Sequence, residues 1–217
     1  MPLQNRVAPT GELFAVPQKG LFMGNRGGRH HDPETKKLLR PTPPSKRWIC
    51  CQLDFKNRHR SVWGHSYTEL FFLDEVTALA AGHRPCFECQ RSKARTFARL
   101  FTQGMGTSSL WSPSEMPANE MDAILHSERG ITHPITNAPE DLPVGTIVSQ
   151  HSGSESQLLA KGPRNWLRWN FDGYCEVPVP DGSNLELITP PCILRVLKAG
   201  YEPVWHPSTH KEINHNI

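Results

Sequence analysis

The sequence lacks any long hydrophobic run. Apolar residues make up 37% of the 217-residue chain. No window approaches the roughly 18 consecutive apolar residues that indicate a membrane-spanning helix. The first residues, MPLQNRVAPTGELFAVPQKG, contain no apolar segment of the kind found in secretory signals. We therefore expect a cytoplasmic protein that has no membrane partner.

Several common catalytic and nucleotide-binding motifs are also missing. The chain contains neither the Gly-x-Gly-x-x-Gly of dinucleotide-binding folds nor the Gly-Lys-Ser/Thr of a phosphate-binding loop. No His-x-Glu precedes the Pro-Cys-x-x-Cys at 85–89, so the acid–base residue of a zinc deaminase is absent. The formal net charge is only +3, and the pI of about 8.6 lies below the value above about 9 of a dedicated nucleic-acid domain. This balance allows a local basic patch but excludes a uniformly basic surface.

Turn-forming residues are abundant, with 20 prolines and 16 glycines that divide the chain into short elements. Six cysteines in a reducing compartment are better explained as thiols or metal ligands than as disulfides. The predicted fold class is α+β. We expect a zinc-stabilised β-hairpin and helix in the N-terminal half, and a small antiparallel β-meander with a terminal helix in the C-terminal half. The predicted segments are a zinc-binding region with a basic N-terminal loop (1–104), a helical and proline-rich linker (105–143) and a β subdomain (144–217).

Local patterns predict the individual elements. Short apolar segments bounded by polar turns predict strands over 47–55 and 67–72, which we expect to pair as a hairpin. Asp74 is the predicted N-cap of a short helix, and Gly82 is its predicted C-terminal stop. The meander strands are predicted at 145–150, 156–162, 165–171, 174–179 and 185–189, and further helices at 90–101, 118–128 and 192–199.

A C-x-x-C pair, Cys86 and Cys89, lies directly before the predicted helix at 90–101. Two thiolates at this spacing on a tight turn can hold one tetrahedral zinc ion, and backbone N–H groups at a helix start stabilise their charge. Redox-active dithiols share the spacing, but a thioredoxin-like site requires a strand–helix–strand context. The segment before this pair reads as strand, short helix and turn. We therefore favour a zinc site, with two inert thiols as the alternative.

The stretch YTELFFLDEVTALAAGHRPCFEC, residues 67–89, resembles the end of the metal-binding domain of the Ada DNA-methylation repair protein and its relatives. In that family a Phe-rich strand, a short helix and an Ala-Ala-Gly-aromatic-Arg-Pro-Cys-x-x-Cys turn follow in the same order. The resemblance covers about residues 47–92 and implies that Cys86 and Cys89 are half of a four-ligand zinc site. No Pro-Cys-His-Arg occurs in the chain, so alkyl transfer of the Ada type is not supported.

The first ligand pair of that family lies on the preceding hairpin, where this chain departs from the pattern. It has adjacent Cys50 and Cys51, and neighbouring strand residues point to opposite faces, so we expect at most one of them to bind the ion. Cys51 shares its face with apolar residues, which suits a buried thiol, whereas Cys50 shares its face with Gln52 and Asp54. Simple burial of both is the alternative.

Four histidines are candidates for the remaining ligand, and each has a surface or core role as its alternative. They are His59, His65, His30 and His31. Two further cysteines, Cys175 and Cys192, fall in a predicted strand and a predicted helix and are expected to fill the core. The predicted metal set is Cys86, Cys89, Cys51, Cys50 and His59, with Zn²⁺ as the cofactor.

The helix after the C-x-x-C pair has a basic side. Arg91, Arg95 and Arg99 recur at i, i+4 and i+8, with Lys93 nearby. Guanidinium groups one turn apart can contact successive phosphates of DNA or RNA without reading the bases. The alternative is a solvated helix face that binds nothing.

The stretch FMGNRGGRHHD, residues 22–32, is rich in glycine, arginine and histidine. Glycines let the backbone approach a ligand closely, and His30, His31 and Asp32 are candidates for proton transfer or metal binding. A flexible basic loop is the alternative interpretation.

Three functions follow from these motifs. The first is a zinc-binding cytoplasmic protein that contacts nucleic acid through the basic helix at 90–101. The second is a metal-dependent hydrolase or nuclease that uses the loop from Gly24 to Asp32. The third is a structural zinc protein that acts through protein partners.

Overall fold

The computed structural model of the chain describes residues 1–39, 45–57, 61–106, 115–153 and 155–210. Over these residues the fold is α+β, with two six-stranded sheets and four α-helices. None of the described helices combines the length and the apolar character needed to cross a membrane.

The α-helices begin and end near the positions that the sequence predicts. The Asp74 side chain accepts a hydrogen bond from the Thr77 N–H at 2.8 Å and caps the first helix, and Gly82, with a φ of +75°, follows its end. The amphipathic helix after the C-x-x-C pair buries the predicted apolar face, including Phe97 and Phe101. The helices are α1 (Glu75–Ala80), α2 (Arg91–Gly104), α3 (Ala118–Glu128) and α4 (Pro191–Lys198), with 3-10 turns at Pro139–Asp141 and Pro207–His210.

The first sheet is built from short strands that come from distant parts of the sequence. They are β1 (Arg6–Val7), β2 (Leu13–Phe14), β3 (Phe22–Asn25), β4 (Ile49–Gln52), β5 (Leu70–Phe72) and β6 (Arg84–Pro85). Their spatial order is β2-β1-β5-β3-β4-β6, and the β1–β5 and β4–β6 pairs are parallel.

The predicted hairpin between 47–55 and 67–72 is wrong, because β3 lies between β4 and β5 and pairs with both. The glycines of residues 22–32 predict a loop, whereas Phe22–Asn25 form β3. Gly24 explains the difference: a Cβ at this position would lie 2.2 Å from the Ile49 carbonyl oxygen and 2.8 Å from the Phe72 ring. The glycine is therefore needed for close strand packing rather than for loop mobility.

The second sheet is antiparallel throughout, and its predicted meander is confirmed. Its strands are β7 (His133–Pro134), β8 (Ile147–Ser152), β9 (Glu155–Lys161), β10 (Trp166–Asn170), β11 (Gly173–Val177) and β12 (Leu185–Leu187). Strands β8 to β11 each pair with the next along the chain, and β12 returns to the free edge of β8. The expectation that Cys175 fills the core is wrong, because its outward-facing position on β11 leaves it exposed, whereas Cys192 is buried.

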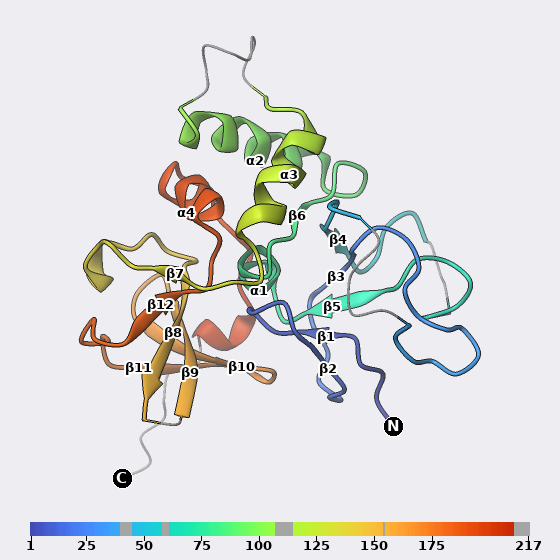
Figure 1. Cartoon of the computed structure of the whole chain (residues 1–217), viewed down its shortest axis with the longest axis horizontal. Coiled ribbons are helices and arrows are strands. Elements are labelled where there is room, and N and C mark those ends of the chain that lie inside the picture. Colours follow the sequence, from blue (N-terminus) through green and yellow to red (C-terminus); the bar gives the residue numbers. More distant parts are fainter. Residues whose placement is uncertain (40–44, 58–60, 107–114, 154, 211–217) are drawn as a thin grey trace.

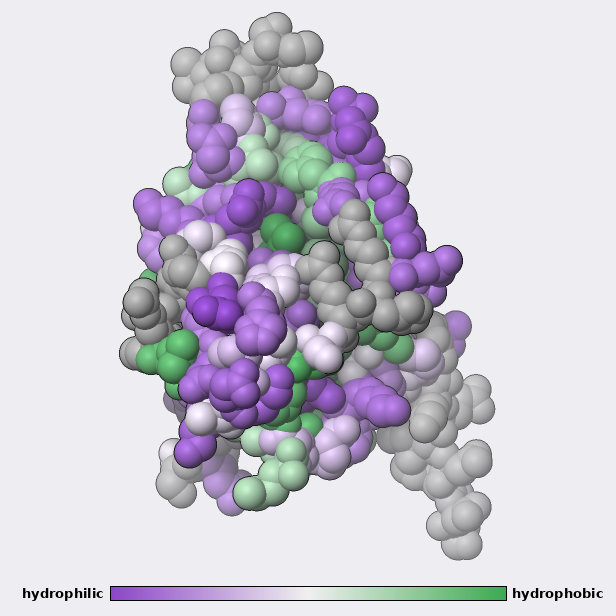
Figure 2. Space-filling model, turned by 90° about the vertical axis from the view of Figure 1, so that its right-hand side faces the viewer, coloured by the Kyte–Doolittle hydropathy of each residue, from purple (hydrophilic) through white to green (hydrophobic). Residues whose placement is uncertain are grey.

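Figure 1 shows the first sheet on the right and the second at the lower left, with α1 between them and α2, α3 and α4 above. One apolar cluster joins Phe97 and Phe101 of α2 to Ile193 and Val196 of α4. The division into 1–104, 105–143 and 144–217 stays a prediction, although this cluster unites side chains from the first and last of these segments. Figure 2 shows the side that carries the first sheet, where apolar residues form small areas between hydrophilic ones.

Candidate metal centre

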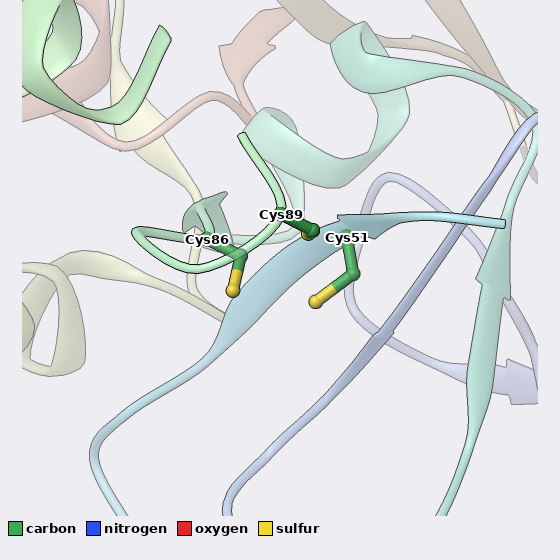
Figure 3. A group of neighbouring side chains, drawn as sticks. All are labelled: Cys51, Cys86 and Cys89. Atoms are coloured by element: carbon green, nitrogen blue, oxygen red, sulfur yellow. The ribbon is translucent and has the colours of Figure 1, made fainter. Parts of the chain in front are cut away.

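Three of the predicted metal ligands lie together. The Sγ atoms of Cys51, Cys86 and Cys89 are all within 4.8 Å of one another. Cys51 comes from β4, and the other two flank the turn between β6 and α2; Figure 3 shows the three sulfurs converging on one space. Zinc–sulfur bonds of about 2.3 Å place tetrahedral thiolates about 3.8 Å apart, so a shift of about 1 Å is enough to form a site.

The alternation of β4 separates Cys51 from Cys50. Cys50 is fully buried in the apolar cluster behind the sheet, with Leu70 and Phe72. It is absent from the group of converging sulfurs, and its face is the reverse of the one that the sequence analysis assigned. The apolar residues that the alternation places with Cys51, Leu53 and Phe55 among them, line the open side of the sheet together with it, and Leu53 is exposed, so this side is not a core.

The backbone of Cys50 nevertheless holds the centre in shape. Its carbonyl oxygen accepts hydrogen bonds from the Cys86 N–H and from the Gln90 side-chain amide, both at 2.9 Å. These bonds fix the start and the end of the C-x-x-C turn against β4. The turn therefore lies beside Cys51 because β4 and β6 pair in parallel.

The three cysteine side chains are hydrogen-bonded to one another, and these bonds favour a thiolate at Cys86. Hydrogen bonds from Cys51 and Cys89, with a further one from the Glu88 N–H at 3.4 Å, hold the pKa of Cys86 far below its usual value. The hydrogen bond to Cys86 raises the pKa of Cys51. A thiolate stabilised by neighbouring S–H groups is the arrangement from which a metal ion displaces protons.

The described residues offer no histidine to this group. His59 lies outside the described part of the chain, and His65 is exposed and is not in the cysteine group. His30 and His31 are buried in the loop after β3. Among the described residues, three cysteines are therefore the ligands that the structure brings together.

His31 and Asp32 have structural partners. The ring of His31 donates to the Gly64 carbonyl at 2.7 Å, hydrogen-bonds with the Thr68 hydroxyl at the same distance, and stacks on Trp63 at 5.3 Å. Asp32 is half-buried and accepts a hydrogen bond from the Glu34 N–H at 2.9 Å, which lowers the pKa of its carboxyl group. Neither residue reaches the cysteine group.

His30 is almost completely buried, at 3% exposed. Burial, with the nearby charges of Arg26 and His31, lowers its pKa to about 4. Its backbone N–H donates to the Thr68 hydroxyl, so the residue helps to fix the same loop as His31. The described structure therefore gives the predicted proton-transfer residues a supporting role for the segment around Thr68.

The basic side of α2 is present, but its four cations differ in their surroundings. Arg91, Arg95 and Arg99 are exposed, and Arg95 lies 3.7 Å from the Glu115 carboxylate. Lys93 instead forms an ion pair with the fully buried Glu75. Lys93 therefore anchors α2 to α1, which leaves the three arginines as the exposed basic face.

The cysteine centre opens onto a groove that the sequence analysis did not predict. Its volume is about 1390 Å³, and Cys51, Cys86 and Cys89 are part of its wall. A buried ion pair on the same wall, Arg84 with Asp122 at 2.8 and 3.0 Å, ties β6 to α3. The groove is hard to predict from the sequence. Its two halves are brought together by β3, and the glycine of this strand, Gly24, is equally typical of a loop.

Comparison with protein families, with curated proteins and with solved structures finds no match to this chain. The likeness of residues 47–92 to the Ada metal-binding domain therefore rests on the motif alone and stays a hypothesis. What the geometry defines is a class of site: a three-cysteine group able to bind a metal ion at the wall of an open groove.

Proposed function

We propose that the protein binds a zinc ion through Cys51, Cys86 and Cys89 and presents it to a ligand in the adjoining groove. The observation that carries this proposal is the convergence of the three sulfurs on the groove wall. Soft thiolate ligands select zinc, copper(I) or iron–sulfur clusters, and a C-x-x-C turn with one further cysteine fits tetrahedral zinc.

Three protein ligands beside an open space distinguish ligand-binding zinc sites from structural ones, which are closed by a fourth protein ligand. A zinc ion held here supplies Lewis-acid chemistry to whatever occupies the groove. This supports a metal-dependent enzyme of the hydrolase type over a zinc that only stabilises the fold. The acid–base groups of such an enzyme would have to come from the groove rather than from His30, His31 and Asp32.

Metal analysis of purified variants tests the zinc site. We expect about one zinc per chain in the wild type and in Cys175→Ser, whose cysteine is exposed on the second sheet. Cys51→Ser, Cys86→Ser and Cys89→Ser should each retain far less zinc, because each removes one of three thiolates. Cobalt substitution gives a second readout, since sulfur-to-cobalt absorption should decrease only in these three variants. A wild-type protein without zinc, or a Cys51→Ser variant with full zinc content and unchanged cobalt absorption, would refute the proposal.

Contact with nucleic acid through α2 is a second candidate. It is favoured by the exposure of Arg91, Arg95 and Arg99 on a helix that starts two residues after Cys89, so that bound metal would fix the approach of the helix. Retention of the wild type on DNA or RNA that falls with salt, and that the triple variant to alanine loses, would support it. Equal retention of the triple variant would reject it.

A further inference from the structure

The face of the first sheet that carries Cys51 forms the floor of the groove. Cys51 and Phe71 both lie opposite Met23 of β3, so the three side chains form one row across β4, β3 and β5. Alternate residues of a strand point to the same face. Stepping two residues along β4 and β5, away from the cysteine, leads to positions 49 and 69, and then to Arg47 and Tyr67, all of which line the groove.

Glu69 is the unusual residue of this floor. It is 3% exposed, and one carboxylate oxygen accepts a hydrogen bond from the Trp63 backbone N–H at 2.8 Å. The indole N–H of Trp63 donates to the Glu69 carbonyl at 2.9 Å, so the residue is held at two points. The other carboxylate oxygen, Oε1, is buried without a hydrogen-bond partner in the described structure. A buried acceptor of this kind lacks the donor that such groups normally have, so it indicates a donor on a ligand.

The surroundings of Glu69 narrow the class of ligand. Tyr67 lies two residues before Glu69 and Phe71 two residues after it, and both line the same groove. Level with Tyr67, two exposed cations, Lys46 and Arg47, lie on the rim of the same groove. The floor therefore combines an acceptor for an N–H group, aromatic surfaces and a positively charged rim.

We infer that this half of the groove binds a nucleotide whose base carries an amino group. The amino group donates to Oε1 of Glu69, the base packs against Tyr67 and Phe71, and the phosphate lies near Lys46 and Arg47. A simple amine would use the carboxylate but not the cations, and inorganic phosphate would use the cations but not the carboxylate or the rings. A nucleotide with an exocyclic amino group matches all three features.

This inference uses the groove of the proposed function but does not depend on the metal. Glu69 lies two strands and one two-residue step from Cys51, which corresponds to about 12 Å for strands about 4.8 Å apart with a rise of about 3.4 Å per residue. The two groups therefore contact different parts of a bound molecule. Each can be tested while the other is intact.

Calorimetric titration with matched nucleotides tests the inference on the wild-type protein. Cytidine and uridine monophosphates differ in an amino group against a carbonyl, as do adenosine and inosine monophosphates. We expect the amino member of each pair to bind about tenfold more tightly, because a hydrogen bond to a charged acceptor is worth about one factor of ten or more. Equal affinity within both pairs, tighter binding of the carbonyl member, or no binding at millimolar concentration would overturn it.

Two substitutions test whether the preference for the amino nucleotide comes from Glu69. Glu69→Gln keeps the size of the side chain but adds a donor, so the difference within each pair should fall below about twofold. Glu155→Gln is the control, because Glu155 is an exposed carboxylate on β9 of the second sheet, and it should leave the preference unchanged. An unchanged preference in Glu69→Gln, with a wild-type circular dichroism spectrum, would contradict the assignment.

Zinc analysis on the same preparations separates this inference from the proposed function. A protein that holds zinc but shows no preference for the amino group refutes the nucleotide site alone. A protein that shows the preference but holds no zinc refutes the metal site alone.

Discussion

The two sheets of this protein differ in how they are assembled. In the second sheet, β8 to β11 follow one another along the chain and pair in sequence. In the first, strands between Arg6 and Pro85 pair out of order, and β3 is inserted between β4 and β5. Both sheets pack apolar side chains against a core, but it is the first that carries the cysteine centre and the groove. Non-sequential pairing brings Met23, Cys51 and Glu69 onto one surface. The site therefore forms only when segments that are distant in the sequence pair in the folded protein.

Removing the metal should produce the largest difference between the sheets. At free zinc about a thousandfold above its dissociation constant, binding to the native state contributes about 4 kcal/mol to the free energy of unfolding. Because the ligands join β4 to the turn after β6, chelation should reduce amide hydrogen-exchange protection in those strands. Protection in β9 and β10 should change much less. An equal loss of protection in both sheets would show that they unfold as one unit. It would contradict the proposed difference between the two sheets.

Asp74 lies where the two regions meet, and its titration gives the next largest effect. Its carboxylate accepts the His206 N–H at 3.0 Å, and complete burial raises its pKa from 3.8 to about 6. The folded protein thus holds this proton more tightly than the unfolded chain. The resulting stabilisation is fully present below pH 3.8 and is lost as pH rises through 6, a change of about 3 kcal/mol at 1.36 kcal/mol per unit.

Denaturant unfolding of the wild type and of Asp74→Asn at pH 4 to 7 measures this change as a difference between the two proteins. The wild type should lose stability relative to the variant as pH rises. Asp181→Asn is the control: Asp181 is exposed and its pKa is lowered by hydrogen bonds from Ser183, so its contribution has the opposite sign. A difference for Asp74→Asn that stays constant with pH would contradict the raised pKa.

Two glycine substitutions compare the sheets directly. Gly24→Ala should destabilise the fold by about 2 kcal/mol, because its Cβ would meet the backbone of Ile49 and the cost of overpacking is about 1 to 3 kcal/mol. Gly153→Ala, in the β8–β9 turn, meets nothing within 4 Å and carries only the cost of a positive φ, about 1 kcal/mol. Thermal denaturation of both variants shows which substitution causes the larger loss of stability. A larger loss for Gly153→Ala would show that β3 is not packed as described.

The smallest expected effect is on the basic face of α2. Because Arg91, Arg95 and Arg99 are exposed, replacing each by alanine should change stability by no more than about 0.5 kcal/mol. Lys93→Ala should cost more, since it leaves the buried Glu75 carboxylate without its cation. Chemical denaturation of the four variants tests whether the arginines are available for binding while Lys93 anchors α2 to α1.

The contrast between the sheets also explains what could be predicted. The meander, the capped α1 and the apolar face of α2 follow from local signals: turn residues, an N-cap and a helical repeat. The pairing of β3 could not be predicted, because Gly24 is equally typical of a loop and of a crowded strand. Cys86 and Cys89 were identified from their spacing. The roles of Cys50 and Cys51 were reversed, because the face of a four-residue strand depends on which elements cover it.

X-ray absorption at the zinc edge of the purified protein tests the central claim most directly. We predict three sulfur neighbours at about 2.3 Å and one oxygen neighbour at about 2.0–2.2 Å, as expected for three cysteines and a position open to the groove. A shell of four sulfurs, a shell that includes imidazole scattering, or the absence of zinc would contradict the account.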